Sequence, residues 1–126
     1  MLKENLGLGR LAEEIAVTFL EENGFQILAR NFRIRLGEVD IVAKEKDTFC
    51  FIEVKSKSSD RFGDPLEAVS LIKQRQISRV ALSYLKENKL LHKSARFDVV
   101  SVVFTQSGPK IELIRDAFNL GGELSY

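Results

Sequence analysis

The stretch that decides the fold is GEVDIVAKEKDTFCFIEVKS, residues 37–56. Two runs within it, 38–44 and 48–56, are rich in β-branched and aromatic residues, and they flank a polar turn at 45–47. This pattern predicts a β-hairpin. Because side chains alternate between the two faces of a strand, the register of the hairpin decides which residues meet.

The register can be predicted from the hydrophobic pattern. A hairpin that turns symmetrically about Lys46 and Asp47 sorts its cross-strand pairs into two faces. One face is wholly apolar and pairs Val39 with Val54, Ile41 with Ile52 and Ala43 with Cys50. The other face pairs Glu38 with Lys55, Asp40 with Glu53 and Val42 with Phe51. A slip of one residue would mix the two faces, so the apolar face supports this register.

The second face places two carboxylates opposite each other. In this register the Cβ atoms of Asp40 and Glu53 lie about 4.5–5.5 Å apart, where like charges destabilise a sheet. A divalent cation would remove the repulsion, and Mg²⁺ prefers one or two carboxylates together with water and phosphate oxygens. Lys55 follows Glu53 by two residues and projects from the same face. The hairpin therefore predicts two metal ligands beside one cation. The other interpretation is a solvated face of alternating charges, which the neighbouring Phe49 and Phe51 disfavour.

Length and composition set bounds on the rest of the chain. It has 126 residues, of which 44% are hydrophobic and 29% charged, as is typical of one soluble globular domain. We expect that domain to span residues 1–118, with a flexible tail at 119–126. The formal net charge of +1 excludes DNA binding through a general positive field but leaves room for a local basic groove. One Cys and one His exclude a disulfide framework, a zinc finger and an iron–sulfur cluster within one chain.

The sequence carries no recognisable signal for export or membrane insertion. Residues 1–5 lack the apolar core of a signal peptide, and no apolar run approaches the roughly 20 residues of a membrane span. The sequence therefore predicts a cytoplasmic protein without a membrane partner.

The remaining segments predict helices around a sheet. Apolar residues recur at helical spacing over 9–23, and the Asn-Gly pair at 23–24 supplies a stop. The capping pattern Asp-Pro-Leu-Glu at 64–67 opens a longer helix that runs to about residue 88. Extended segments are expected at 25–35, 38–44, 48–56, 96–104 and 110–114, with Gly37 as a break between the first two. The order α-β-β-β-α-β-β is typical of an α/β fold in which a mixed sheet is flanked by helices.

Side chains on both helices are predicted to face the hairpin. Glu13 lies at the edge of the apolar stripe of the first helix and can reach a metal at the sheet, whereas Glu14 points to solvent. Lys73 falls in the middle of the apolar stripe of the second helix and Gln76 on its border, so both are predicted to point at the site of Lys55. Two alternatives stay open. Glu13 can simply mark the boundary between the apolar and polar faces of its helix, and Lys73 can extend its ammonium outward to water.

Basic residues cluster locally although the chain is nearly neutral. Arg75 and Arg79 are four residues apart and share one face of the second predicted helix. Clusters that flank a metal site suit a phosphate backbone, and a solvated basic face is the alternative. The candidate DNA-binding residues are Arg30, Arg33, Arg35, Lys57, Arg61, Lys73, Arg75 and Arg79.

The hairpin residues resemble a known nuclease motif. The runs GEVDIV at 37–42 and FIEVKS at 51–56 are similar to the Asp…Glu-x-Lys core of the restriction-endonuclease-like superfamily. Three further blocks extend the likeness, namely GRLAEE at 9–14, GFQILARN at 24–31 and KQRQ at 73–76. Over residues 9–115 the chain resembles the YraN-like family of bacterial proteins, which is similar in fold to archaeal Holliday-junction resolvases.

The resemblance implies roles for the same residues. Asp40 and Glu53 would ligate Mg²⁺, or Mn²⁺ in its place, with the backbone carbonyl of Val54 as a further ligand. Lys55 would position or activate the attacking water and stabilise charge on the phosphate. Glu13 would match the helix-borne carboxylate of the resolvases and add a metal ligand.

The sequence therefore predicts a metal-dependent endonuclease that hydrolyses DNA phosphodiester bonds. Its candidate catalytic residues are Asp40, Glu53, Lys55, Glu13 and Gln76. Glu38 is expected to orient Lys55 through the predicted pairing. Since neither a recognition helix nor an aromatic stacking platform is evident, we expect selectivity for DNA shape, as for branched or nicked DNA in repair or recombination. Cutting a junction needs two active sites, which predicts a homodimer.

Two other functions remain open. A non-catalytic module that binds nucleic acid or acts as a scaffold would need only the basic clusters, whereas catalysis needs Asp40, Glu53 and Lys55 together. A small structural protein, in which Glu53 and Lys55 pair with neighbours, predicts affinity for neither metal nor DNA. The presence of all three residues favours the enzyme.

Overall fold

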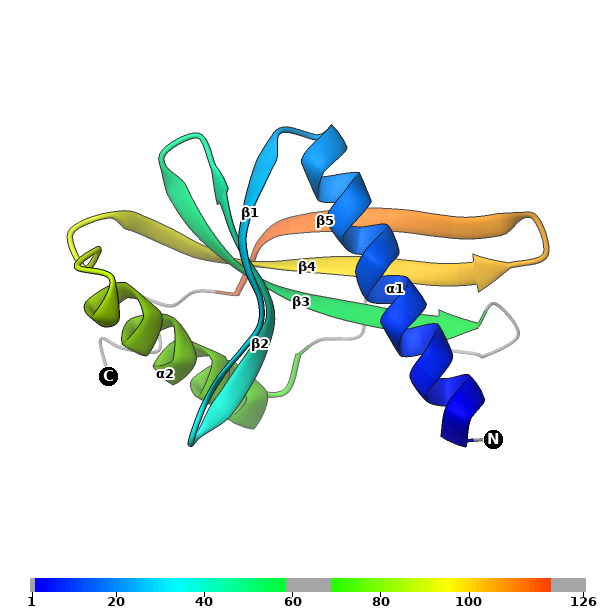
Figure 1. Cartoon of the computed structure of the whole chain (residues 1–126), viewed down its shortest axis with the longest axis horizontal. Coiled ribbons are helices and arrows are strands. Elements are labelled where there is room, and N and C mark those ends of the chain that lie inside the picture. The colour runs from blue at the N-terminus through cyan, green and yellow to red at the C-terminus, as the bar shows by residue number, and fades with distance from the viewer. Residues whose placement is uncertain (1, 59–68, 119–126) are drawn as a thin grey trace.

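The structure, a computed structural model, describes residues 2–58 and 69–118, and the side chains of the first helix from residue 7 onward. The helices are α1 (Leu2–Glu22) and α2 (Leu71–Glu87), and the strands are β1 (Phe25–Ile34), β2 (Gly37–Glu45), β3 (Thr48–Ser58), β4 (Ser94–Thr105) and β5 (Gly108–Phe118). Their order along the chain is the predicted α-β-β-β-α-β-β (Figure 1). The predicted fold class, a mixed sheet flanked by helices, is confirmed.

A single sheet holds the five strands in chain order, β1-β2-β3-β4-β5. Neighbouring strands are antiparallel except β3 and β4, which are parallel because α2 forms the crossover between them. Residues of α1 pack with Ile41 and Ile52, whereas residues of α2 pack with Val42 and Phe51. Because alternate strand residues face opposite sides, the two helices cover opposite faces of the sheet (Figure 1).

The β2–β3 hairpin has the predicted register only in part. The ladder runs from the turn at Lys46 and Asp47 to the pair Ile41–Ile52 and ends there. The predicted pairs beyond it are therefore not ladder partners, namely Asp40–Glu53, Val39–Val54 and Glu38–Lys55. The predicted face of Val39 is wrong, because Val39 packs in the α2 cluster whereas Ile41 packs in the α1 cluster. The cause is that β2 turns away from β3 here, while it stays paired with β1 as far as Gly37.

The predicted start of the second helix is also wrong. α2 begins at Leu71, with Ser70 as its N-cap in an extended conformation, and Ser70 Oγ accepts the Lys73 N–H at 3.2 Å. The capping pattern at 64–67 lies outside the described residues, but Val69 and Ser70 are not helical. Ser70 satisfies an N–H of the first turn by itself, so the helix needs no earlier cap.

Three further boundaries differ from the prediction or go untested. α1 begins at Leu2 rather than at residue 9, and it ends as predicted before Gly24, whose φ of 90° suits glycine. The predicted break between the first two strands falls at residues 35–36 rather than at Gly37, which opens β2 and pairs with Ile34. The predicted tail at 119–126 lies outside the described residues. Among those described, no helix is long and apolar enough to cross a membrane.

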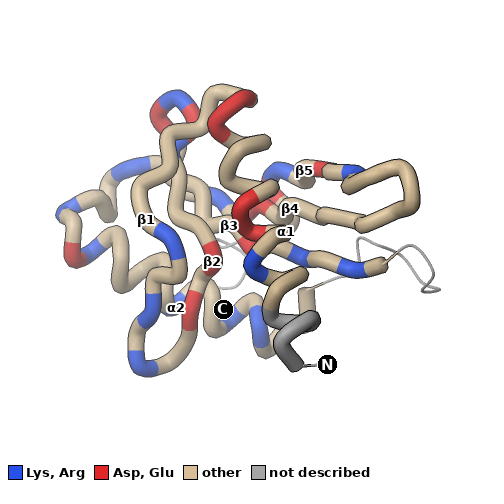
Figure 2. The backbone as a smooth tube through the Cα atoms, turned by 45° about the vertical axis from the view of Figure 1, so that its right-hand side comes forward, with Lys and Arg blue, Asp and Glu red and all other residues tan. Residues whose placement is uncertain are grey.

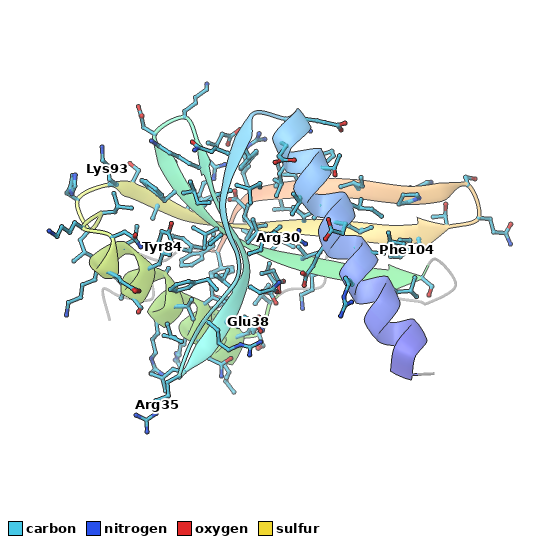
Figure 3. The ribbon with its side chains drawn as sticks, in the orientation of Figure 1. Arg30, Arg35, Glu38, Tyr84, Lys93 and Phe104 are labelled. Carbon is cyan, nitrogen blue, oxygen red and sulfur yellow. The ribbon has the colours of Figure 1, made fainter. Side chains whose placement is uncertain are left out.

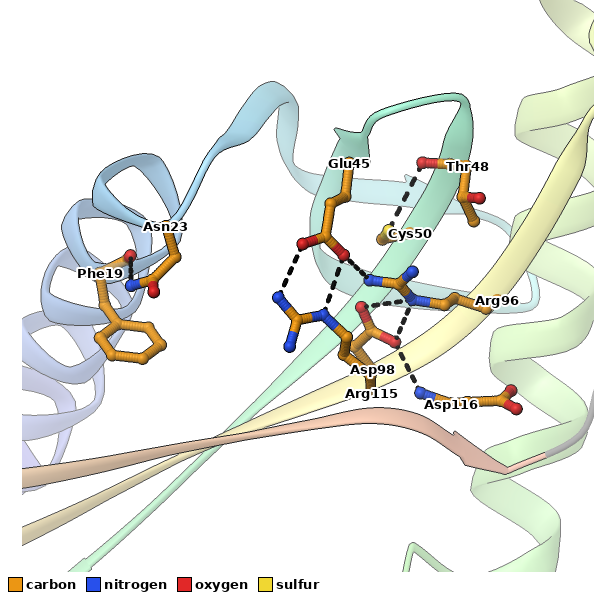
Figure 4. A network of polar contacts seen from close by, with 9 residues as sticks. All are labelled: Phe19, Asn23, Glu45, Thr48, Cys50, Arg96, Asp98, Arg115 and Asp116. Atoms are coloured by element: carbon orange, nitrogen blue, oxygen red, sulfur yellow. Dashed lines mark hydrogen bonds and ion pairs between the residues drawn. The ribbon is translucent and has the colours of Figure 1, made fainter.

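A network of arginines and carboxylates joins β2, β4 and β5 near the β2–β3 turn (Figure 4). Glu45 accepts hydrogen bonds from Arg115 at 2.7 and 2.9 Å and another from Arg96. Arg96 also donates to the fully buried Asp98 at 2.9 Å. Hydrogen bonds from Arg115, and then from Arg96, outweigh burial and lower the pKa of Glu45 to about 2. Every acceptor in this network is partnered, so we assign it a structural role.

Gly37 is placed where a larger residue would disturb the packing of β2 on α2. A Cβ atom at Gly37 would lie 3.3 Å from Val80 Cγ2 and 3.4 Å from Gln76 Cβ. We expect Gly37→Ala to lower the free energy of unfolding by about 1–2 kcal/mol, since added atoms overpack a close contact. Gly9→Ala is the matched control: a Cβ there meets nothing within 4 Å. It should raise the free energy by about 0.5–1 kcal/mol, because alanine favours helix. Urea unfolding measures both, and equal effects would contradict the packing argument.

Candidate metal centre

The candidate site lies where β2 separates from β3. Beyond the Ile41–Ile52 pair, the backbone N–H of Val54 has no ladder partner on β2, and it donates to Asp40 Oδ2 at 2.8 Å. The Asp40 side chain thus takes the place of a backbone acceptor, and the hydrogen bond from Val54 fixes the position of Asp40 Oδ2. Glu53 precedes Val54 on β3 and is buried, with 9% of its surface exposed.

Like charges meet at this opening. Burial, followed by the charge of Glu53, raises the pKa of Asp40 well above its ordinary value, and the hydrogen bond from Val54 opposes the shift only in part. Burial and then the charge of Asp40 also raise the pKa of Glu13 on α1. Asp40 on β2 therefore lies within electrostatic reach of two other carboxylates, Glu13 on α1 and Glu53 on β3.

Cations on two other elements offset part of this charge. Lys73, in the first turn of α2, places its Nζ atom 3.4 Å from Glu53 Oε2. Arg30 on β1 donates to Glu14 at 2.9 Å and lies 4.0 Å from Glu13 (Figure 3). Two residues predicted to bind DNA thus form ion pairs with carboxylates beside the candidate site.

Glu13 has a second partner that sequence analysis missed. Asn31 Nδ2 donates to Glu13 Oε1 at 3.4 Å. Asn31 lies within β1 with a positive φ of 52°, a conformation that asparagine tolerates better than most residues. An asparagine within a predicted strand was the available signal. Glu14 is 58% exposed at its side chain, in agreement with the prediction that it points to solvent.

The predicted orienting contact of Glu38 is not formed as a strand pair. Glu38 Oε2 accepts from Arg33 at 3.2 Å, and Glu38 is the ladder partner of Arg33, not of Lys55. Lys55 remains two residues from Glu53 on β3, paired with Ser101 of β4. Gln76 packs its Cβ atom close to Gly37, and no described contact joins Gln76 to either Asp40 or Glu53. The catalytic roles of Lys55 and Gln76 stay predictions.

Most of the remaining basic candidates lie on the β1–β2 hairpin or on α2. Figure 2 shows basic positions along the β1–β2 hairpin and along α2, which pack together. Arg35 lies at the tip of that hairpin, pointing away from the body of the molecule (Figure 3). Arg75 and Arg79 are exposed on α2, and Lys57 lies on β3. Arg61 lies outside the described residues.

The chemistry of the donors suits a hard cation held by few protein ligands. Within residues 2–58 and 69–118, no three His, Cys, Asp or Glu side chains are grouped so as to hold a metal together. The site thus offers the pair Asp40 and Glu53, and Mg²⁺ takes one or two carboxylates with water and phosphate oxygens completing its shell. Glu13 lies close to the pair without making a three-carboxylate cluster, and its role as a ligand, like that of the Val54 carbonyl, stays a prediction.

Comparison with known proteins finds one family whose sequence model matches most of this chain. Residues 12–102 match the family described as "Uncharacterised protein family UPF0102". A UPF0102 protein of Syntrophus aciditrophicus is 48% identical over 119 residues, covering 94% of each chain. A UPF0102 protein of Geobacter metallireducens is 48% identical over 120 residues, covering 95% of this chain and 98% of the relative.

Solved structures are more distant. Pyrococcus furiosus SfsA in complex with Ca²⁺ is 16% identical with a TM-score of 0.39, over 89% of this chain and 63% of that one. SSO0001 is 15% identical with a TM-score of 0.39, over 94% of this chain and 55% of that one.

The repulsion at the site predicts that a neutral side chain stabilises the protein without metal. Asp40→Asn keeps an oxygen for the Val54 N–H and removes the charge that faces Glu53. In EDTA at pH 8 we expect the free energy of unfolding to rise by about 1 kcal/mol, the scale of one pKa unit. The raised pKa makes ionised Asp40 unfavourable in the folded state. The stability gained by the substitution should therefore be complete above the folded-state pKa of Asp40, about 7, shrink as pH falls from about 7 to 3.8, and vanish below 3.8, the ordinary pKa of an aspartate.

Chemical denaturation at several pH values measures this gain. Asp47→Asn, in the exposed β2–β3 turn, is the control for the same chemical change and should have little effect. A loss of stability in Asp40→Asn at pH 8 would contradict the account, because it would show that the negative charge of Asp40 holds the fold together.

Proposed function

The chain belongs to the UPF0102 family, and we propose that it is a Mg²⁺- or Mn²⁺-dependent endonuclease that hydrolyses DNA phosphodiester bonds. The observation that carries the proposal is the juxtaposition of Asp40 and Glu53 where β2 separates from β3. Two buried or half-buried carboxylates destabilise each other in the absence of a cation. A bound divalent ion explains why the fold keeps them together.

Asp40 and Glu53 fit such an ion in charge and in chemistry. Both supply hard oxygen ligands, and the Val54 N–H fixes the orientation of Asp40, as supporting hydrogen bonds do for metal-binding carboxylates. The Val54 carbonyl and Glu13 are the proposed further ligands. A bound divalent cation supplies a Lewis acid that polarises the phosphate and acidifies water.

The other residues act on the substrate. Lys55 projects from the same face of β3 as Glu53, so its ammonium offsets negative charge that develops on the phosphate. Gln76 is proposed to assist from α2. Glu38 accepts a hydrogen bond from Arg33, and its charge contributes to the raised pKa of Asp40. The proposed phosphate contacts on the DNA backbone come from Arg30, Arg33, Arg35, Lys57, Arg61, Lys73, Arg75 and Arg79.

Shape rather than base sequence is the proposed basis of substrate choice. Most of the described basic residues lie along the β1–β2 hairpin and on α2, and contacts of such residues with phosphates orient DNA without reading its sequence. Branched or nicked DNA of repair or recombination is therefore the proposed substrate. A homodimer would supply the two sites that symmetric cleavage of a junction needs.

Cleavage of labelled four-way junction, nicked and linear duplex DNA tests the proposal. The wild type should cut branched or nicked DNA in Mg²⁺ or Mn²⁺ and not in EDTA. Asp40→Asn and Lys55→Met should each reduce the cleavage rate by about 10²–10³-fold, the usual cost of losing a group that stabilises the transition state. Lys86→Met, in the last turn of α2, removes a charge elsewhere and should leave the rate unchanged.

Each outcome separates the candidate functions. DNA binding without cleavage of any substrate would contradict the nuclease and support a non-catalytic binding module. Affinity for neither DNA nor metal would support a structural protein. Equal rates in the wild type and Asp40→Asn would assign any observed cleavage to a contaminant.

A further inference from the structure

Lys73 occupies a position that its helix disfavours. It lies in the first turn of α2, three residues after the N-cap Ser70, where the helix dipole repels a cation and favours acidic residues. The first turn of α2 contains no acidic residue. Its ammonium instead meets Glu53 at 3.4 Å, and the charge of Lys73 also lowers the pKa of Asp40. The attraction that places this cation therefore comes from the carboxylate pair.

The surroundings hold the backbone of Lys73 while leaving its side chain partly in water. Ser70 Oγ accepts the Lys73 N–H at 3.2 Å, and Gln74 Nε2 donates to the Val69 carbonyl at 2.8 Å, so the helix start is fixed. The Lys73 side chain is 40% exposed, whereas that of Glu53 is 11% exposed. A flexible stem with a strongly hydrated head can leave its partner at low cost, but Glu53 would then need another cation.

We propose that Lys73 is a resident counter-ion, which leaves Glu53 when a divalent cation binds between Asp40 and Glu53 and then binds the phosphate of the DNA. This inference rests on the proposed function, and it gives Lys73 two successive partners, first Glu53 and then a DNA phosphate. With no metal, the Lys73 ammonium offsets the repulsion between the carboxylates. With metal and DNA, the same ammonium is free to meet the anion that arrives. The Lys73 ammonium thus competes with the metal for Glu53 and afterwards binds the phosphate of the substrate.

This role predicts effects of opposite sign on metal and substrate. Removing the charge in Lys73→Met eliminates the competitor, so the affinity for Mn²⁺ alone should rise by roughly tenfold, since like charges a few ångströms apart repel strongly near a surface. Binding of a nicked DNA duplex in saturating Ca²⁺, and the rate of its cleavage in saturating Mn²⁺, should fall. Lys73→Arg keeps the charge and should keep the Mn²⁺ affinity of the wild type.

Calorimetric titration of the full chain with Mn²⁺ measures the first effect. Lys86→Met, on the last turn of the same helix, changes the net charge equally and should leave Mn²⁺ affinity unchanged. Thermal unfolding without metal checks that Lys73→Met is folded, and its midpoint should fall because the carboxylates lose a counter-ion. If it does not fold, Lys73→Gln replaces it, with the same expected gain in affinity.

The outcomes distinguish this inference from the proposed function. Tighter Mn²⁺ binding with weaker DNA binding in Lys73→Met supports the exchange. Unchanged or weaker Mn²⁺ binding overturns it and leaves Lys73 as an ordinary ion-pair partner, while the metal site of the proposed function stands. If neither the wild type nor Lys73→Met binds Mn²⁺, the metal site itself is absent and both proposals fail.

Discussion

The hydrogen bond from the Val54 N–H to Asp40 is the interaction on which the rest of the candidate site depends. The β2–β3 ladder ends at Ile41–Ile52, so this donor of β3 has no backbone acceptor on β2. A side-chain carboxylate takes that place, which satisfies the donor and at the same time brings a charge next to Glu53. The candidate site therefore lies at the point where β2 separates from β3. Because Asp40 accepts the Val54 N–H, the two strands can separate without leaving this N–H unpaired.

Charge balance around this bond explains the surrounding ion pairs. Glu13, Asp40 and Glu53 come from three different elements, and Lys73 and Arg30 approach them from two others. The far end of the hairpin shows the contrasting case, since Glu45 lies between two arginines and its pKa falls to about 2. Glu45, at one end of β2, is thus stabilised by its arginine partners. Asp40, near the other end, lies close to like charges that destabilise its ionised form.

The sequence predicted the fold best in strands where apolar residues alternate with polar ones and the apolar side chains are buried. The order of elements and the register from Ile41 to the turn follow from alternating apolar residues, because a slip would expose them. The point where the ladder ends could not be predicted, since it depends on how β2 twists away from β3. The start of α2 was also missed, because the motif at 64–67 and Ser70 are both good caps and the choice between them depends on packing.

The candidate site residues could be predicted only in part, because spacing indicates which strand or helix face a residue lies on but not which partner its side chain contacts. The spacing on two strands and a helical stripe singled out Asp40, Glu53, Lys55 and Glu13 as candidates, whose roles stay predictions. The structure brings Asp40 within electrostatic reach of Glu53 and Glu13, but not through the predicted strand pairing. Partners that depend on side-chain rotamers did not follow, which is why Glu38 was assigned to Lys55 and not to Arg33. Asp98, within a predicted buried strand, was a visible signal of the arginine network, because a buried carboxylate needs a partner.

The most direct test of the central claim is anomalous diffraction from crystals of the full chain grown with Mn²⁺. We expect a manganese peak beside the Asp40 and Glu53 carboxylates, with the Val54 N–H still bound to Asp40 and the Lys73 ammonium away from Glu53. A Mn²⁺-containing crystal without a peak at these two carboxylates, and with Lys73 still paired to Glu53, would contradict it.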